Sequence, residues 1–200
     1  MDGTYLTCIR TGAAGAVAAK YLSREDSQVA GFVGCGAQAR AQLSCLLEVR
    51  HIRKIKIWQF PKDKECAQRF SRWARKYYKL ETHVSARIDV VTMQSDIVIT
   101  TTPSRVPLVT RVSPGTHINV IGADAPGKQK INPEILKQST VVVDDWIQAS
   151  HSGEMNVPLS RKQITKREMH AQMGDIVTGK KRGRISAKEI TLFDATGLAI

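Results

Sequence analysis

The sequence predicts an α/β protein whose sheet is doubly wound and mostly parallel. Three observations lead to this prediction. Short apolar runs, typical of buried strands, alternate along the chain with segments of helical periodicity. One of these runs leads through a glycine turn directly into a helix, and several others end in polar residues. The length of 200 residues suits one such domain with a substantial core.

The residues at the glycine turn indicate what this domain binds. Val29–Val33 is apolar, Gly34 makes a tight turn, and Gly36 leaves room for the backbone to approach a pyrophosphate. Ala39 lies at the third position of this fingerprint, where a small residue lets the helix lie against the strand. These features predict a Rossmann-type dinucleotide-binding domain, with an ordinary glycine turn as the alternative. The helix is expected to bury a face formed by Ala39, Leu43 and Leu46.

The other elements follow from the same alternation. A helix of small residues is expected over 11–22, with Thr11 as its N-cap. Further helices are expected over 66–79 and 133–138, and strands at 54–59, 81–84, 96–102, 116–121, 141–143 and 189–193. Strands that alternate with helices in this way predict a parallel sheet with right-handed crossovers.

Gln59 ends the second predicted strand and bears on the choice of cofactor. It lies 23 residues beyond Gly36, close to where NAD-binding folds place the acid that holds the ribose 2′-hydroxyl. The acid is missing here, and Lys62 and Lys64 follow. Since a carboxylate would repel a 2′-phosphate, its absence favours NADP slightly over NAD.

The net charge of +12 raises the question of a nucleic-acid partner. Eleven Lys and Arg residues lie between positions 50 and 79. The predicted helix there has an apolar face formed by Cys66, Phe70, Trp73 and Tyr77. Its other face carries Arg69, Arg72, Arg75, Lys76 and Lys79. A solvated helix face explains this pattern better than a phosphate-tracking surface, since no nucleic-acid motif is present.

Composition excludes several other classes. Apolar residues make up 42% and charged residues 24% of the chain, as in ordinary globular proteins. No apolar run approaches a membrane span of about 20 residues, and the start does not resemble a secretory signal. The histidines are scattered, so no metal site is expected. Free thiols and a cytoplasmic location are expected because the cysteines, Cys8, Cys35, Cys45 and Cys66, form no C-x-x-C pair.

Asp124 is a candidate catalytic residue because of its place after a predicted strand. In doubly wound sheets the ligand lies over the carboxyl ends of the strands. Asp124 follows the strand 116–121 and Gly122, where its carboxylate can act as a general base. Asp also commonly caps turns, and 125–127 is a turn-like segment. The pattern alone supports both roles equally.

Six segments together resemble the ornithine cyclodeaminase/mu-crystallin family, and most of all its archaeal alanine dehydrogenase branch. They are spread in order from near the start of the chain to its end. The segments are 10–14 (RTGAA), 34–38 (GCGAQ), 101–105 (TTPSR), 115–119 (GTHIN), 122–129 (GADAPGKQ) and 193–200 (FDATGLAI).

The resemblance implies an NAD(P)-dependent enzyme that acts on small α-amino acids, with hydride transfer through an imino acid. By motif match, Asp124 would be the catalytic acid/base and Arg10 would pair with the substrate carboxylate. The cofactor site would be lined by Thr11, Gly34, Gly36, Ala37, Gln38, Gln59, Thr102, Ile121, Lys128, Ala195 and Thr196.

The resemblance also implies that family members are longer at both ends. Their N-terminal region supplies a substrate-binding lysine and most of a homodimer interface, and a C-terminal helix packs beside it. Residues 1–200 would then be the NAD(P)-binding domain of this longer architecture. Whether the chain is active alone stays open, and a non-catalytic, crystallin-like NADP-binding protein or an inactive fragment is the alternative.

Overall fold

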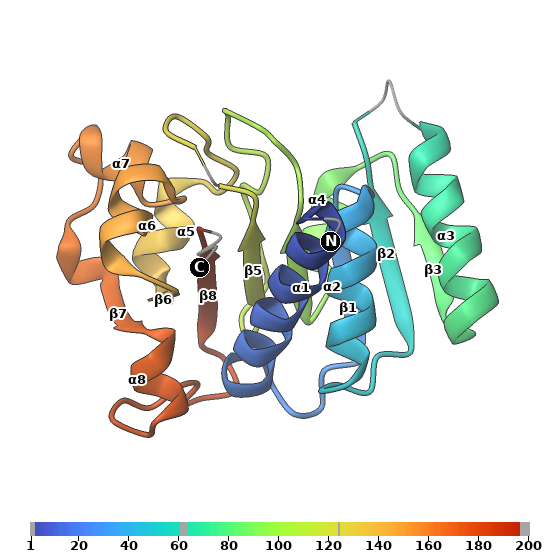
Figure 1. Ribbon diagram of the computed structural model, residues 1–200, viewed down its shortest axis with the longest axis horizontal. Coiled ribbons are helices and arrows are strands. Elements are labelled where there is room, and N and C mark those ends of the chain that lie inside the picture. The colour runs from blue at the N-terminus through green and yellow to red at the C-terminus, as the bar shows by residue number, and fades with distance from the viewer. Residues whose placement is uncertain (1–2, 61–63, 124, 197–200) are drawn as a thin grey trace.

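The computed structural model describes residues 3–60, 64–123 and 125–196. Within these residues one sheet of eight strands runs in the order β3-β2-β1-β4-β5-β8-β6-β7, and every neighbouring pair is parallel (Figure 1). The strands are β1 Val29–Val33, β2 Lys54–Trp58, β3 Glu81–Val84, β4 Ile97–Thr100, β5 His117–Ile121, β6 Ser139–Val143, β7 Met169–Gln172 and β8 Ile190–Ala195. The prediction of a parallel α/β sheet is confirmed.

Helices cover both faces of the sheet, so the sheet is doubly wound. They are α1 Gly3–Leu22, α2 Ala37–Leu47, α3 Lys64–Tyr78, α4 Ile88–Met93, α5 Pro133–Gln138, α6 Trp146–Ser152, α7 Asn156–Ser160 and α8 Met173–Val177, with a 3-10 turn at Lys166–Glu168. Apolar side chains of α1, α2, α3 and α8 form one core with the sheet, and those of α4, α5 and α6 form the other. Ala39, Leu43 and Leu46 are buried in the first core, as predicted.

The order of the strands reverses at β1, because β2 pairs with one side of it and β4 with the other. Successive crossovers therefore leave in opposite directions from this point. Such a switch point opens a crevice at the carboxyl ends of the two strands, where open α/β sheets bind their ligands. Figure 1 shows this edge of the sheet at the top of the molecule.

Helix α1 begins at Gly3 instead of Thr11, so the prediction that Thr11 is an N-cap is wrong. Thr11 lies in the middle of the helix, and its carbonyl oxygen accepts a hydrogen bond from Gln42 on α2 over 2.8 Å. The two helices pack closely because the facing positions are glycine: a Cβ at Gly12 would lie 2.8 Å from the carbonyl oxygen of Ala41.

A buried polar chain fixes α1 to the sheet. The side-chain amide of Asn119 on β5 donates to the carbonyl of Gly15 over 2.9 Å, and His117 contacts both Asn119 and Thr191. The hydroxyl of Thr191 donates to the carbonyl of Leu22 at the end of α1 over 2.7 Å. Complete burial lowers the pKa of His117 to about 3, so this imidazole is neutral at physiological pH.

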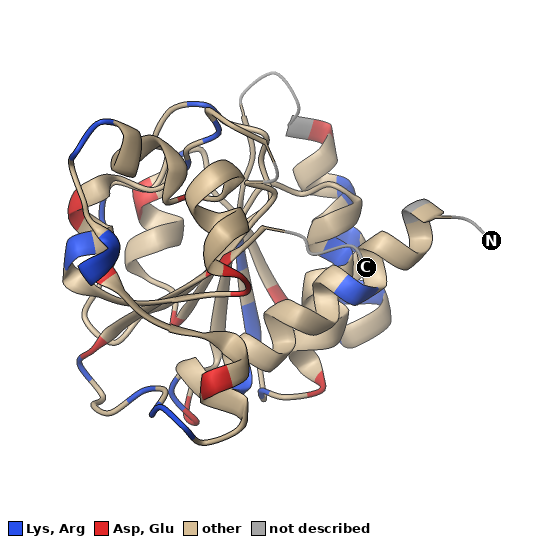
Figure 2. Cartoon of the chain, turned by 60° about the vertical axis from the view of Figure 1, so that its left-hand side comes forward, with Lys and Arg blue, Asp and Glu red and all other residues tan. Residues whose placement is uncertain are grey.

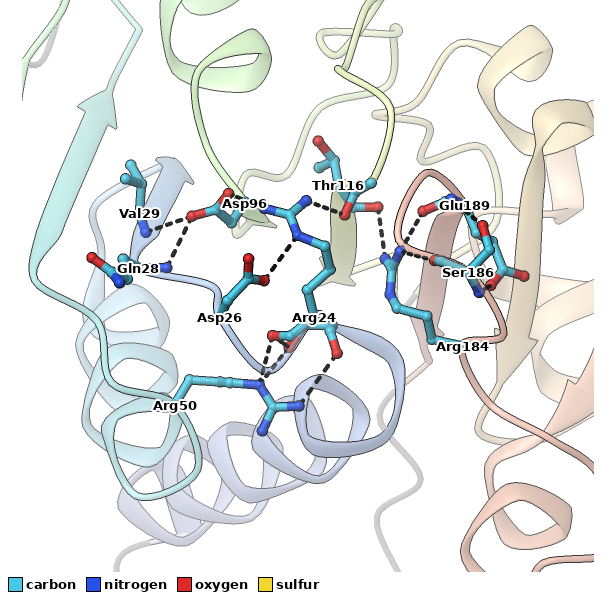
Figure 3. Close-up of polar contacts among 12 residues, drawn as sticks. Arg24, Asp26, Gln28, Val29, Arg50, Asp96, Thr116, Arg184, Ser186 and Glu189 are labelled. Atoms are coloured by element: carbon cyan, nitrogen blue, oxygen red, sulfur yellow. Dashed lines mark hydrogen bonds and ion pairs between the residues drawn. The ribbon is translucent and has the colours of Figure 1, made fainter.

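Three arginines organise the opposite, amino-terminal edge of the sheet (Figure 3). Arg24 bonds Asp96 over 2.5 Å, and the second carboxylate oxygen of Asp96 accepts the backbone amides of Gln28 and Val29. Arg50 and Arg184 bond backbone carbonyls at the end of α1. These charge-assisted bonds fix the entry of β1 relative to β4 and α1.

The remaining differences from the prediction are local. Tyr77 was expected on the apolar face of α3, but it is 62% exposed, and the buried face is formed by Ala67, Phe70 and Ala74. The basic side chains of that helix face solvent, as predicted. In Figure 2, Lys and Arg positions are spread over helices, strands and loops. The last strand was expected to stop at Phe193, whereas β8 continues to Ala195 and buries Asp194. Helices α4, α6, α7 and α8 and strand β7 were not predicted.

Candidate cofactor site

The turn between β1 and α2 has the geometry that its glycines predict. Gly34 has a φ of +108°, and a Cβ there would lie 2.7 Å from Oγ1 of Thr101. Only glycine avoids both problems. A Cβ at Gly36, in contrast, would meet no atom within 4 Å. The structure thus needs Gly34 for its own backbone and leaves the space over Gly36 open.

Helix α2 begins at this open space without a side-chain cap. Its N-cap is Gly36, which has no side chain to accept from the first-turn amides. The amide of Ala39 donates to the carbonyl oxygen of Gly36 over 3.1 Å, whereas the amides of Ala37 and Gln38 lie too early in the helix to have an acceptor within it. The helix dipole adds partial positive charge at the same place. An anionic group such as a pyrophosphate would complete the helix terminus.

Unsatisfied polar atoms surround the turn. Buried oxygen atoms of Thr11, Gln38, Thr101 and Thr102 have no hydrogen-bond partner among the described residues. Buried polar atoms in native proteins are nearly always paired, so these oxygens are available to a polar ligand at the turn. Thr11, Gln38 and Thr102 were predicted as cofactor-binding residues, and the structure places them on α1, on α2 and after β4.

Two hollows border the turn. One, of about 710 Å³, lies over the start of α2 and is lined by residues of α1, α2 and α3, among them Cys8, Gly36 and Ala37. The other, of about 310 Å³, lies between the carboxyl ends of β2 and β4. It is lined by Trp58, Gln59, Phe60, Thr102, Pro103, Ser104, Val106 and Leu108. Its apolar walls and its place beside the switch point fit a flat heteroaromatic ring.

Gln59 lies where these features meet. It directly follows β2, lines the smaller hollow, and is partly exposed. The thiol of Cys35 donates to its Oε1 over 3.2 Å. Lys62, which was expected to favour a 2′-phosphate, lies outside the described residues, as does the side chain of Lys64.

The other predicted residues fall into three groups. Ile121 and Ala195 are register partners at the carboxyl ends of β5 and β8, on the far side of the switch point. Thr196 follows them, and both its amide and its hydroxyl donate to the carboxylate of Asp144. Arg10 lies on α1 and is partly buried. Asp124 lies outside the described residues, so its position stays a prediction.

A glutamate that the sequence did not reveal holds the loop after β5. Oε1 of Glu154 accepts the backbone amides of Lys130 and Ile131, over 2.7 and 2.6 Å. The side chain of Asn156 accepts from the amide of Gly127 over 3.4 Å. Lys128, a predicted cofactor residue, lies between these two anchors. The partners of Glu154 are backbone amides distant in sequence, so no pattern of residue types could have indicated this role.

Glu154 belongs to a fully buried cluster of charged groups. Nζ of Lys130 lies 3.7 Å from Oε2 of Glu154, and both side chains are completely buried. Asp194 is also buried, and its Oδ2 accepts the amide of Met155 over 3.4 Å. Desolvation raises the pKa of Glu154 to about 6 and that of Asp194, next to Glu154, to about 8. Burial next to Glu154 therefore favours the protonated form of Asp194.

Other kinds of site find no support in the part of the chain that the structure describes. It contains no group of His, Cys, Asp and Glu residues that could hold a metal ion, and none of its four cysteines forms a disulfide. No helix among the described residues is long and apolar enough to cross a membrane.

The switch point, the uncapped helix and the glycine turn define a doubly wound fold of the Rossmann type. Comparison with known proteins agrees and is more specific. The model of the ornithine cyclodeaminase/mu-crystallin family matches residues 1–200, and the chain belongs to this family.

Several characterised relatives and solved structures resemble the whole chain. It is 47% identical to an alanine dehydrogenase of Archaeoglobus fulgidus and 30% identical to a Δ1-pyrroline-2-carboxylate reductase of Bacillus cereus. An archaeal alanine dehydrogenase dimer with bound NAD superposes with a TM-score of 0.94 at 46% identity, over 99% of this chain and 61% of that one. The Thermococcus litoralis Δ1-pyrroline-2-carboxylate reductase, in complex with NADH and L-proline, superposes with a TM-score of 0.93 at 36% identity, over 98% of this chain and 61% of that one.

The chain is shorter than these relatives. Its match covers the whole chain, but only 61% of the Archaeoglobus enzyme and 62% of the Bacillus enzyme. The 200 residues thus span about three fifths of the length of the curated relatives that they match.

Proposed function

We propose that this chain binds a nicotinamide dinucleotide and forms the NAD(P)-binding domain of an oxidoreductase or cyclodeaminase of small α-amino or imino acids. The observation that carries the proposal is the start of α2, where an uncapped helix terminus faces open space over Gly36. The relatives support the same class, since they are named as an alanine dehydrogenase and a pyrroline-carboxylate reductase.

The proposed cofactor site has three parts. The amides at Gly36, Ala37 and Gln38 would bind the pyrophosphate, since they begin an uncapped helix. The adenosine would lie in the hollow between β2 and β4, lined by Gln59 and Thr102. The nicotinamide half would then extend over the ends of β5 and β8, toward Ile121 and Ala195.

When bound, the nicotinamide would supply hydride transfer to or from the α-carbon of the substrate. Arg10 would bind the substrate carboxylate, for which the fork of a guanidinium is suited. Asp124 would transfer a proton to or from the reacting imino group or water. Glu154 and Asn156 would fix the loop 125–131, which follows Asp124 and contains Lys128.

We further propose that NADPH binds at least as well as NADH. A Gln at the end of β2 does not repel a 2′-phosphate, whereas the acid usual in NAD-binding sites does. In a chain of the relatives' length we expect a homodimer, because one structural neighbour is described as a dimer.

Titration of the chain with NADH and NADPH, followed by nicotinamide fluorescence at fixed ionic strength, tests this function. Saturable binding of either dinucleotide supports the proposed function, and a chain that binds neither NADH nor NADPH would overturn it. A clear preference for NADH would remove the NADP proposal and leave the dinucleotide site intact.

A further inference from the structure

We propose that Cys35 sets the cofactor selectivity of this site by holding the carboxamide of Gln59. The inference rests on the proposed dinucleotide site and names a residue that determines which form of the cofactor it prefers. Cys35 is the middle residue of the Gly-Cys-Gly turn, and only 3% of its surface is exposed.

The geometry gives Cys35 a defined partner. Parallel pairing of β1 with β2 aligns Val33 with Trp58, and the amide of Gly34 donates to the carbonyl of Trp58 over 2.9 Å. These contacts hold the start of the glycine turn beside the end of β2, where Gln59 follows Trp58. The thiol of Cys35 donates there to Oε1 of Gln59 over 3.2 Å.

This contact decides which end of the carboxamide is available to a ligand. Oε1 is engaged by the thiol, which leaves Nε2 of Gln59 to bond a ligand. An amide nitrogen donates and cannot accept. Gln59 therefore presents a neutral donor at the edge of the hollow between β2 and β4, where it could bond either a hydroxyl or a phosphate.

A free glutamine can turn and present its oxygen instead, which would suit a 2′-hydroxyl and disfavour a 2′-phosphate. Turning the carboxamide would exchange the bond from the thiol to Oε1 for a contact in which the NH₂ group donates to sulfur, a weak acceptor, so the thiol favours the orientation observed. A second thiol holds the backbone of Cys35 in place: Cys66 on α3 donates to the backbone carbonyl of Cys35 over 3.0 Å. The fixed orientation therefore favours NADPH.

The test is a double-mutant cycle on the dissociation constants of NADPH and NADH. The variants are Cys35→Ala, Gln59→Ala and the double variant. Cys35→Ala is expected to lower the preference for NADPH over NADH by about threefold to tenfold, the effect of one modest hydrogen bond. In the Gln59→Ala background the same change should leave the ratio unaffected, since there is then no carboxamide for the thiol to orient.

Two further variants sharpen the result. Gln59→Glu keeps an acceptor for the thiol but places negative charge at the site, so NADPH should weaken more than about tenfold relative to NADH. Cys45→Ala removes a partly buried thiol from α2, away from Gln59, and should leave the ratio unchanged. Thermal melting checks that each variant folds.

The outcomes separate the inference from the function it rests on. If Cys35→Ala changes the dissociation constants of NADPH and NADH by the same factor, the role of Cys35 is overturned. The same holds if Cys35→Ala changes the ratio of the two constants equally in the unmodified chain and in the Gln59→Ala background. Loss of all dinucleotide binding in the unmodified chain would instead overturn the proposed function.

Discussion

The backbone amide of Gly34 donates to the carbonyl oxygen of Trp58 over 2.9 Å, joining the ends of β1 and β2 where the chain turns toward α2. This bond fixes the glycine turn relative to Gln59, the next residue after Trp58. One backbone hydrogen bond therefore fixes the pyrophosphate part of the proposed site relative to the ribose part. Substitutions at the opposite edge of the sheet should accordingly lower stability and leave dinucleotide binding unchanged.

Asp96 provides such a prediction. Its carboxylate accepts the amides of Gln28 and Val29 and pairs with Arg24. Asp96→Ala therefore leaves the two amides without their acceptor and removes one partner of Arg24, which keeps its bonds to Asp26 and to the carbonyl of Gly115. We expect the free energy of unfolding to fall by about 2 kcal/mol. Urea unfolding followed by circular dichroism measures this.

The control for Asp96 is Asp89→Ala on α4. Its carboxylate pairs with Arg87, whose side chain is 74% exposed, and exposed pairs contribute little. Only a small change in stability is expected there. Equal losses in the two variants would show that the Arg24–Asp96 pair has no special role at this edge.

The buried Asp194 makes stability depend on pH. Burial beside Glu154 raises its pKa from 3.8 to about 8, so the folded state keeps a proton that the unfolded chain releases near pH 4. The folded state thus binds more protons, and the free energy of unfolding falls as the pH rises from about 4 to 8. Glu154, with its pKa raised to about 6, acts in the same direction, while Lys130 opposes both shifts.

Asp194→Asn should remove most of this dependence, because the amide mimics the protonated acid. Between pH 5 and pH 8 we expect the variant to lose less stability than the unmodified chain, by on the order of 2 kcal/mol. Urea unfolding at both values tests it, with Asp175→Asn as the control on α8. Parallel pH curves for the unmodified chain and Asp194→Asn would contradict the buried-proton account.

Several of these features could be predicted from residue types, and others could not. β1 and β4 were found because their residues are almost all apolar, and β5 because three of its five residues are isoleucine or valine. β7 was missed because its four residues include His170 and Gln172 and carry no strand pattern. Thr11 was expected to cap a helix, but residues 3–10 contain nothing that stops one, so α1 continues through them.

The candidate site shows the same division. Gly34 and Gly36 were predictable because the turn needs residues without a Cβ, and residue type alone reveals that. Asp194 was expected among the polar residues after the last strand, yet it lies buried inside β8. Its partners, Glu154 and Lys130, come from distant parts of the chain, and only the fold brings them together.

Asp124 gives a prediction about catalysis in a chain extended to the length of the relatives. A general base contributes about 10²–10⁴ in rate, so Asp124→Asn should lower turnover of an amino acid by about that factor. Asn has the same size and can still cap a turn, so the dissociation constant of the cofactor should not change. If Asp124 only caps the turn, both quantities should stay near those of the unmodified chain.

The most direct test compares valine at the two turn glycines. Gly36→Val should fold, since a Cβ there meets nothing within 4 Å, but its side chain would fill the space proposed for the pyrophosphate. Gly34→Val should fail to fold stably, because φ is +108° and the Cβ would approach Thr101. The decisive measurement is the fluorescence titration of Gly36→Val with NADH and NADPH. We predict an unchanged melting temperature and no saturable binding of either dinucleotide; a folded Gly36→Val that binds as tightly as the unmodified chain would contradict a dinucleotide site at this turn.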